Sequence, residues 1–178
     1  MAESFESYLP LGIPCRLQMC KTTAMGQWAF LTDLKMSFFV PVVILAFHKG
    51  VIEGLSSGLF TRENCGIYTS LIHTWMAFGI SPQYIFVPME MIKEDGKIIP
   101  SAKPQIQLKQ QNEIGAMVGN VAFSLADAII FSEILNTPII ISEVAIANIG
   151  VKTDPKGGTF ESQIMKAISA FESGSSNN

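Results

Sequence analysis

The sequence SLADAIIFSEILNTPIIISE occupies residues 124–143 and carries, in succession, the signals of a helix, a tight turn and a buried strand. Ser124 is a good helix N-cap because its hydroxyl can accept from the backbone N–H of Asp127, whose carboxylate then lies at the positive end of the helix dipole. Asn136 suits the left-handed position that ends a helix, and the proline two residues later prevents continuation. The isoleucines at 139–141 show no polar alternation, which predicts a strand covered on both faces.

The neighbouring segments place this unit in a larger α+β pattern. Apolar positions at three- and four-residue spacing predict one buried helix face, made by Leu125, Ala128, Ile129, Ser132 and Leu135. Further strands are predicted at residues 15–20, 27–31, 38–44, 84–89, 98–99, 105–108 and 115–123, and further helices at residues 46–55, 64–78, 144–146 and 159–171. The strands and helices together predict a single α+β domain, a mixed β-sheet with helices packed on it.

Several of these segments allow a second interpretation. Two glycines within residues 46–55 weaken that helix, so a loop is the alternative. Residues 115–123 read best as a strand, but they could also extend the helix that follows. Pro41 lies in a strand that is otherwise apolar on both faces and expected to be central, although proline normally occupies a sheet edge or bulge. Simple alternation would place Cys15 and Cys20 on opposite faces of their strand.

The helix at 64–78 and the one near the C-terminus have the clearest apolar faces outside the first stretch. In the former, Asn64 is the expected N-cap and the expected core-facing stripe consists of Ile67, Leu71, Ile72, Trp75 and Phe78. In the C-terminal helix, Thr159 is the expected cap, and Ile164, Ile168 and Phe171 share a face that we interpret as a subunit contact.

The expected organisation is an N-terminal arm at 1–13, a domain at 14–150, a linker and amphipathic helix at 151–172, and a disordered tail at 173–178.

The composition is apolar and poor in charge. Hydrophobic residues make up 48% of the 178 residues and charged residues 15%, and the mean hydropathy is +0.35, whereas charged residues usually account for about 25%. A large core explains this composition, and so does an apolar surface hidden in a homo-oligomer, which we favour. A net charge of −3, with Arg16 and Arg62 as the two arginines, argues against a large phosphate-binding surface. A small local groove for DNA or RNA remains open.

We expect a cytoplasmic protein that does not enter a membrane. The N-terminal residues are acidic and lack the basic and continuous apolar regions of a secretory signal. The longest apolar run, residues 36–47, contains a proline and is too short to cross a bilayer as a helix. Three cysteines without metal-ligand spacing fit reduced thiols.

The opening stretch also resembles a known family. Residues 127–129 (DAI), 138–139 (PI) and 142–143 (SE) are similar in order and spacing to a signature near the end of bifunctional nuclease (BFN) domains. Residues 40–44 (VPVVI) resemble the L-P-I-W-I segment of that family. The resemblance covers residues 15–148 and implies an α+β domain that hydrolyses DNA or RNA phosphodiesters with a divalent ion, Mg²⁺ or Mn²⁺.

Three polar features of the family are missing from this chain. His48 stands where the family has an acidic residue, residues 121–126 (VAFSLA) replace a polar D-A-R-P-S run, and residues 68–70 (YTS) replace a T-H-D-L-like motif. Such polar groups are the natural candidates for chemistry, so the fold can persist where nuclease activity does not.

The candidate site residues are carboxylates and one histidine. The expected metal ligands are Asp127, Glu143 and Glu53, because a metal nuclease needs convergent carboxylates to hold the ion and orient water. The expected catalytic residues are Asp127, Glu53 and His48, with His48 assisting proton transfer. Each carboxylate also has a structural explanation, as a helix-start, capping or exposed helical residue, and His73 fits a partly buried structural histidine better than a base.

Two functions follow from these observations. The first is a metal-dependent nuclease of the bifunctional type. The second is a catalytically degenerate domain of the same fold that works as a homo-oligomeric binding or scaffold module. The resemblance favours the first, whereas the few cations and the missing polar motif favour the second. Convergence of the three carboxylates around one point would distinguish them.

Overall fold

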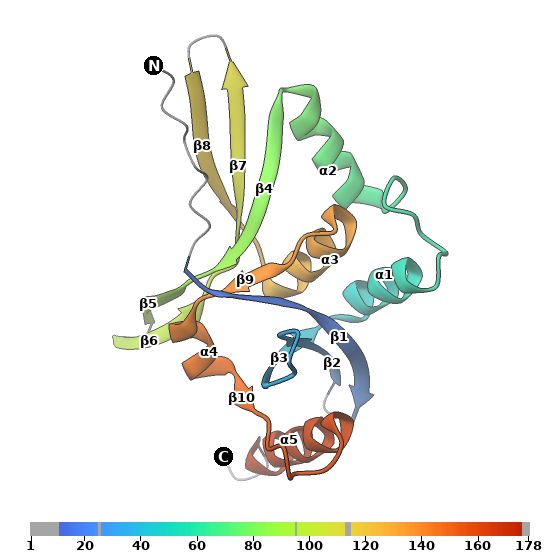
Figure 1. Ribbon diagram of the computed structural model, residues 1–178, viewed down its shortest axis with the longest axis vertical. Coiled ribbons are helices and arrows are strands. Elements are labelled where there is room, and N and C mark those ends of the chain that lie inside the picture. Colours follow the sequence, from blue (N-terminus) through green and yellow to red (C-terminus); the bar gives the residue numbers. More distant parts are fainter. Residues whose placement is uncertain (1–10, 25, 95, 113–114, 176–178) are drawn as a thin grey trace.

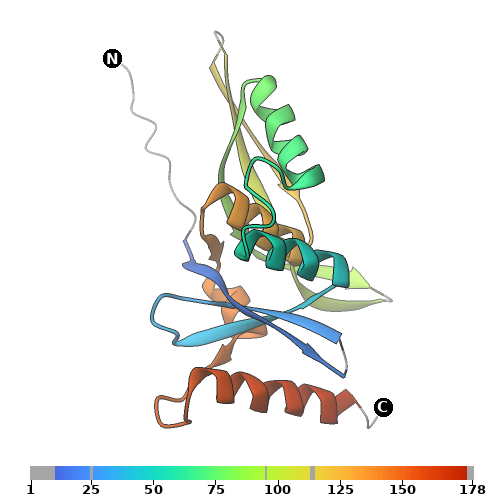
Figure 2. The same cartoon turned by 90° about the vertical axis from the view of Figure 1, so that its right-hand side faces the viewer.

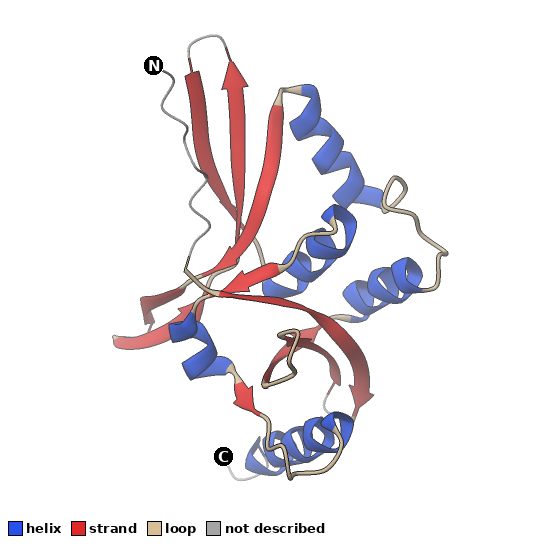
Figure 3. Cartoon of the chain, viewed as in Figure 1, coloured by secondary structure: helices blue, strands red, loops and turns tan. Residues whose placement is uncertain are grey.

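The computed structural model describes residues 11–175 apart from residues 25, 95, 113 and 114, and over this part of the chain it forms a single α+β domain (Figures 1 and 3). The predicted fold class is confirmed. The strands are β1 (Ile13–Thr23), β2 (Gly26–Thr32), β3 (Phe38–Ile44), β4 (Ile80–Val87), β5 (Met89–Glu94), β6 (Lys97–Ala102), β7 (Gln105–Asn112), β8 (Gly115–Ala122), β9 (Ile139–Ile141) and β10 (Val151–Lys152). The helices are α1 (Ala46–Ser56), α2 (Gly66–Ala77), α3 (Leu125–Leu135), α4 (Glu143–Ile149) and α5 (Phe160–Ser175).

Strand β9 joins the two halves of the main sheet. Eight strands lie in the order β10-β3-β2-β1-β9-β4-β7-β8, and β5 and β6 form a separate hairpin. The chain's three consecutive isoleucines pair antiparallel with β1 on one side and parallel with β4 on the other. All three are buried, as predicted for a strand without polar alternation.

Helix α3 begins and ends where the sequence predicts. The Ser124 hydroxyl accepts a hydrogen bond from the backbone N–H of Asp127 at 3.0 Å, and Asn136 ends the helix in the left-handed conformation with φ 51°. The prediction of a single apolar face is wrong, because buried residues surround the helix: Ala126, Ala128, Ile129, Ile130, Phe131, Ser132 and Ile134. The reason is visible in Figures 1 and 2, where α3 lies between the sheet and the neighbouring helices α1 and α2.

A β-bulge in β1 changes which face of the strand meets the main core. The register shifts between Leu17, which pairs with Leu31, and Met19, which pairs with Phe30, so Gln18 is the extra residue. As a result Cys15 and Cys20 both face the main core, not opposite faces as simple alternation predicts. Burial raises the pKa of the Cys15 thiol to about 12, with a smaller contribution from Asp33, so this cysteine stays a neutral core residue.

A second, smaller core lies on the other face of β1, β2 and β3. Phe30 and Phe39 pack there against Ile164 and Ile168 of α5, which covers this face in Figure 2. The Lys21 ammonium forms a 2.5 Å ion pair with Glu161 at the start of the same helix. The predicted apolar face of α5 is therefore used within the chain and not as a subunit contact; the side chain of Phe171 lies outside the described part.

Other boundaries differ from the predictions for local reasons. Ile13 belongs to β1 and residues 173–175 belong to α5, so a strand and a helix extend into the ranges predicted for the arm and the tail, whereas residues 1–10 and 176–178 lie outside the described residues. Asn64 does not cap α2: the N-cap is Cys65, whose backbone N–H donates to the Thr69 hydroxyl at 2.9 Å. Pro41 is accommodated because β10 pairs only with Phe38 and Phe39, which leaves the rest of β3 an edge in the described sheet.

Both ambiguous segments follow the favoured interpretation, residues 46–56 as α1 and residues 115–122 as β8. Of the helices in the described ranges, none is long and apolar enough to cross a membrane.

Candidate functional site

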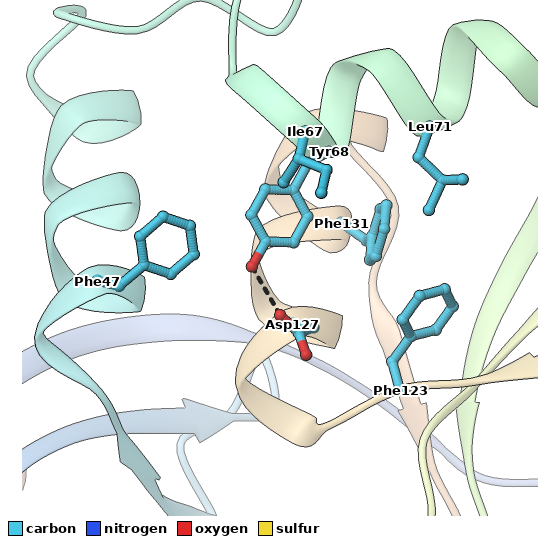
Figure 4. Close-up of a pocket in the computed structure, with 7 residues that line it drawn as sticks. All are labelled: Phe47, Ile67, Tyr68, Leu71, Phe123, Asp127 and Phe131. Atoms are coloured by element: carbon cyan, nitrogen blue, oxygen red, sulfur yellow. Dashed lines mark hydrogen bonds between the residues drawn. The ribbon is translucent and has the colours of Figure 1, made fainter.

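The candidate site is centred on Asp127, in the first turn of α3 at the point where α1 and α2 meet that helix. Oδ2 of Asp127 accepts a hydrogen bond from the Ser124 hydroxyl at 2.5 Å. Oδ1 accepts one from the Tyr68 hydroxyl at 2.6 Å and lies 3.3 Å from Nε2 of His48 (Figure 4 shows the Tyr68 contact). One carboxylate therefore ties together a residue of α1, a residue of α2 and the N-cap of its own helix.

Both ring nitrogens of His48 are engaged within the chain. Nδ1 accepts a hydrogen bond from the backbone N–H of Leu45, the residue before α1, at 3.3 Å. Nε2 faces Asp127, so the arrangement fixes the tautomer with the proton on Nε2. A general base needs an unoccupied ring nitrogen directed at the substrate. In this geometry the His48 ring links α1 to Asp127 of α3, and the role in proton transfer expected for it stays a prediction.

The environment keeps Asp127 ionised and Tyr68 neutral. Partial burial raises the pKa of Asp127, but the hydrogen bonds from Ser124 and Tyr68 and the neighbouring His48 outweigh it, and the pKa lies below its usual value. Burial, followed by the hydrogen bond to Asp127, raises the pKa of Tyr68 well above its usual value. A fully engaged carboxylate of low pKa is a weak base, whereas proton abstraction near neutral pH favours a raised one.

An apolar groove of about 370 Å³ opens above this cluster. Its lining comes from all three helices and from one residue two positions before α3: Phe47, Ile67, Tyr68, Leu71, Phe123, Asp127 and Phe131 (Figure 4). Phe131 and Tyr68 form the buried side, with ring centroids 5.2 Å apart. Phe47 and Ile67 form the rim and remain 58% and 72% exposed. Asp127 is the only ionisable carboxylate among these lining residues, and its oxygens already face three donors.

The structure brings together two of the four predicted site residues, Asp127 and His48. Glu53 instead pairs with Lys49 one turn earlier in α1, at 3.3 Å, and its side chain is 60% exposed. Glu143 is an exposed residue in the first turn of α4, whose N-cap is Ser142. Within the described ranges, no three His, Cys, Asp or Glu side chains form a group that could hold a metal ion. The expected metal set of Asp127, Glu53 and Glu143 is therefore not assembled in this geometry.

The aromatic part of the site is not predicted by the sequence. Tyr68 lies in the segment that replaces a polar motif of the family, yet its hydroxyl is the closest donor to Oδ1 of Asp127. Ile67 and Phe78 were assigned to the buried stripe of α2, but the core side of that helix consists of Tyr68, Ile72 and Trp75, and Ile67 and Phe78 are exposed. His73, expected to be partly buried, is exposed on α2. The one available signal was the excess of apolar residues in α2 over what a single buried face needs.

Comparison with known proteins adds no assignment. No family model matches this sequence, and no curated protein matches it. The resemblance to bifunctional nuclease domains stays a prediction from the residues at 127–143.

Proposed function

We propose that this chain is a non-catalytic binding module, working as a homo-oligomer, whose groove between α1, α2 and α3 holds an uncharged hydrophobic segment of a partner protein. The observation that carries the proposal is the state of Asp127. The carboxylate that the family resemblance would assign to metal and water already receives hydrogen bonds from Ser124 and Tyr68 and faces His48. This leaves shape and apolar surface as the groove's means of recognition.

The lining supports an uncharged occupant. No lysine or arginine is among the described residues that line the groove, and the low pKa of Asp127 keeps a negative charge at its base. An anionic group such as a phosphodiester would meet this charge without a compensating cation, which argues against nucleic acid in the groove.

The rim supports a peptide segment over a small enclosed ligand. Phe47 and Ile67 are largely exposed at the edges of the groove, and a small molecule would leave much of both side chains in water. A hydrophobic side chain inserted between them would bring neighbouring residues of its own chain over the rim. Exposed apolar residues around a groove are typical of protein–protein recognition.

The test uses Nile red, a neutral apolar dye, and two matched variants. Ile67 and Val144 are both exposed second residues of helices, α2 and α4, where an added aspartate suits the helix dipole. We expect saturable Nile red fluorescence with the wild type, at least about tenfold weaker binding with Ile67→Asp, and no change with Val144→Asp. The capped, uncharged dipeptide acetyl-Phe-Leu-amide should displace the dye. Equal binding by the two variants would place the apolar site elsewhere and contradict the proposal.

The competing function is tested separately by cleavage. Labelled single-stranded DNA and RNA are incubated with purified protein and Mg²⁺ or Mn²⁺, beside an EDTA control. We expect no metal-dependent cleavage, because the carboxylates are not gathered and His48 has no ring nitrogen directed outward. Metal-dependent cutting that a folded Asp127→Asn variant lacks would favour the nuclease and overturn the non-catalytic assignment.

A further inference from the structure

Strand β8 is the outermost strand of the main sheet, and its outer side faces no other strand of the described chain (Figure 1). Its residues 115–122 read GAMVGNVA, with no proline and no charged residue. Long edge strands without such residues are ready to pair with another strand, and proteins normally protect them with proline, lysine, a bulge or short length. The other edges of the described sheets carry such protection. The strand β10 has two residues, and the part of β3 beyond it contains Pro41. In the two-stranded sheet, β5 contains Lys93 and β6 contains Lys97 and Pro100.

The register with β7 identifies which backbone groups of β8 point outward. Just beyond the ladder, the backbone N–H of Phe123 donates to the carbonyl of Pro104 at 3.0 Å, which is the next pair in the register after Gln105 and Ala122, so the odd-numbered residues of β8 form the hydrogen-bonded pairs. Residues 115, 117, 119 and 121 therefore direct their N–H and C=O groups toward β7. The outward groups belong to Ala116, Val118, Asn120 and Ala122, each of which has an N–H to donate.

We propose that two copies of this chain associate through β8, antiparallel about a two-fold axis at Gly119. Hydrogen-bonded residues must face each other in an antiparallel ladder. The register that uses all four outward residues pairs Val118 with Asn120 of the partner subunit and Ala116 with Ala122 of the partner subunit. It makes about eight backbone hydrogen bonds and joins the two sheets into one.

Gly119 fits the position on the axis. In this register it faces its own copy as a non-hydrogen-bonded pair, where the two Cα atoms approach to about 4.5 Å. A Cβ added at Gly119 meets nothing within 4 Å in the chain, and its φ is not among the positive values recorded for the glycines. The isolated chain thus accepts any side chain at this position, whereas two like charges would be forced together across the axis.

The experiment introduces a positive or a negative charge at Gly119 and measures dimer formation by sedimentation, from low-micromolar to roughly 100 µM protein. We expect the wild type and Gly119→Ala to dimerise, and Gly119→Lys and Gly119→Glu each to dimerise about tenfold more weakly or worse. An equimolar mixture of the Lys and Glu variants should recover dimer as the heterodimer. Circular dichroism and thermal unfolding at low concentration verify that all variants keep the monomer fold.

Two results would overturn this assignment. One is a wild type that remains monomeric at roughly 100 µM. The other is a Lys or Glu variant that dimerises as tightly as the wild type, because the subunits would then meet through another surface. The edge of β8 is independent of the groove on α1, α2 and α3, so loss of Nile red binding in Ile67→Asp and loss of dimer in the Gly119 variants test separate claims.

Discussion

Replacing Phe131 with alanine is expected to lower the free energy of unfolding by about 3–5 kcal/mol. Phe131 is 1% exposed and contacts three other aromatic residues. Its ring centroid lies 4.8 Å from that of Phe123, 5.2 Å from that of Tyr68 and 5.9 Å from that of Trp75. Truncation removes the ring that these three side chains share and leaves a cavity below the groove, since α3 is held by the sheet and cannot collapse onto it.

Chemical denaturation of the variant measures this loss directly. The matched control is Phe47→Ala, which removes the same side chain from the rim of the same groove, where it is 58% exposed. For the control we expect a change of about 0.5 kcal/mol. Similar losses in the two variants would mean that Phe131 is not the buried support of the groove.

Replacing Asp127 with alanine is expected to cost about 2–4 kcal/mol. The change removes the acceptor of the Tyr68 hydroxyl, and Tyr68 is only 6% exposed, so the O–H of a largely buried side chain loses its partner. It also removes the acceptor of Ser124 at the start of α3 and the contact with His48. Asp127→Asn should cost less because an amide oxygen can still accept from Tyr68.

The control for Asp127 is Glu143→Ala. Glu143 is likewise an acidic residue in the first turn of a helix, but it is exposed. Its loss should cost no more than about 0.5 kcal/mol, the contribution of a surface charge near a helix N-terminus. Equal effects in the two variants would reduce the role of Asp127 to a dipole interaction and contradict the link between helices.

The pH dependence of the same variants has a definite sign. The pKa of Asp127 is lowered in the folded chain, so its contribution is present above the unfolded value of about 3.9 and disappears as the pH falls through the folded value. The pKa of Tyr68 is raised, so its contribution is present below the unfolded value of about 10 and disappears as the pH rises through the folded value. The stability difference between wild type and Asp127→Ala should therefore be largest between about pH 4 and pH 10 and shrink outside this window. A difference that stays constant down to about pH 2 would contradict the assignment of a stabilising carboxylate.

Local sequence signals predicted most elements, because each rests on the chemistry of one or two residues. The hydroxyl of Ser124 starts α3, the left-handed Asn136 ends it, and the isoleucines of β9 are apolar on both faces. The placement of α2 and α3 in the layers could not be predicted in the same way. Whether one face or the whole circumference of a helix is buried depends on what packs around it, and periodicity alone does not contain that information.

For a similar reason, only two of the four candidate site residues predicted from the sequence lie together in the structure. Asp127 and His48 are 79 positions apart, and the family resemblance brought them into one hypothesis. The same reasoning added Glu53, which has a nearer partner in Lys49 on its own helix, and Glu143, which belongs to another helix start. Tyr68 stands where a polar motif of the family is missing, so the sequence marks it as a loss, and only the fold directs its hydroxyl at a carboxylate.

The extra residue Gln18 has a consequence for how the molecule folds. Because the bulge shifts the alternation of the strand, Cys15, Leu17 and Cys20 all face the main core, and Met19 contributes to the second core on the opposite face. Both cores depend on this strand, so loss of the strand would remove side chains from both of them. We therefore expect α5, which packs on the second core, to unfold together with the rest of the domain in one cooperative transition.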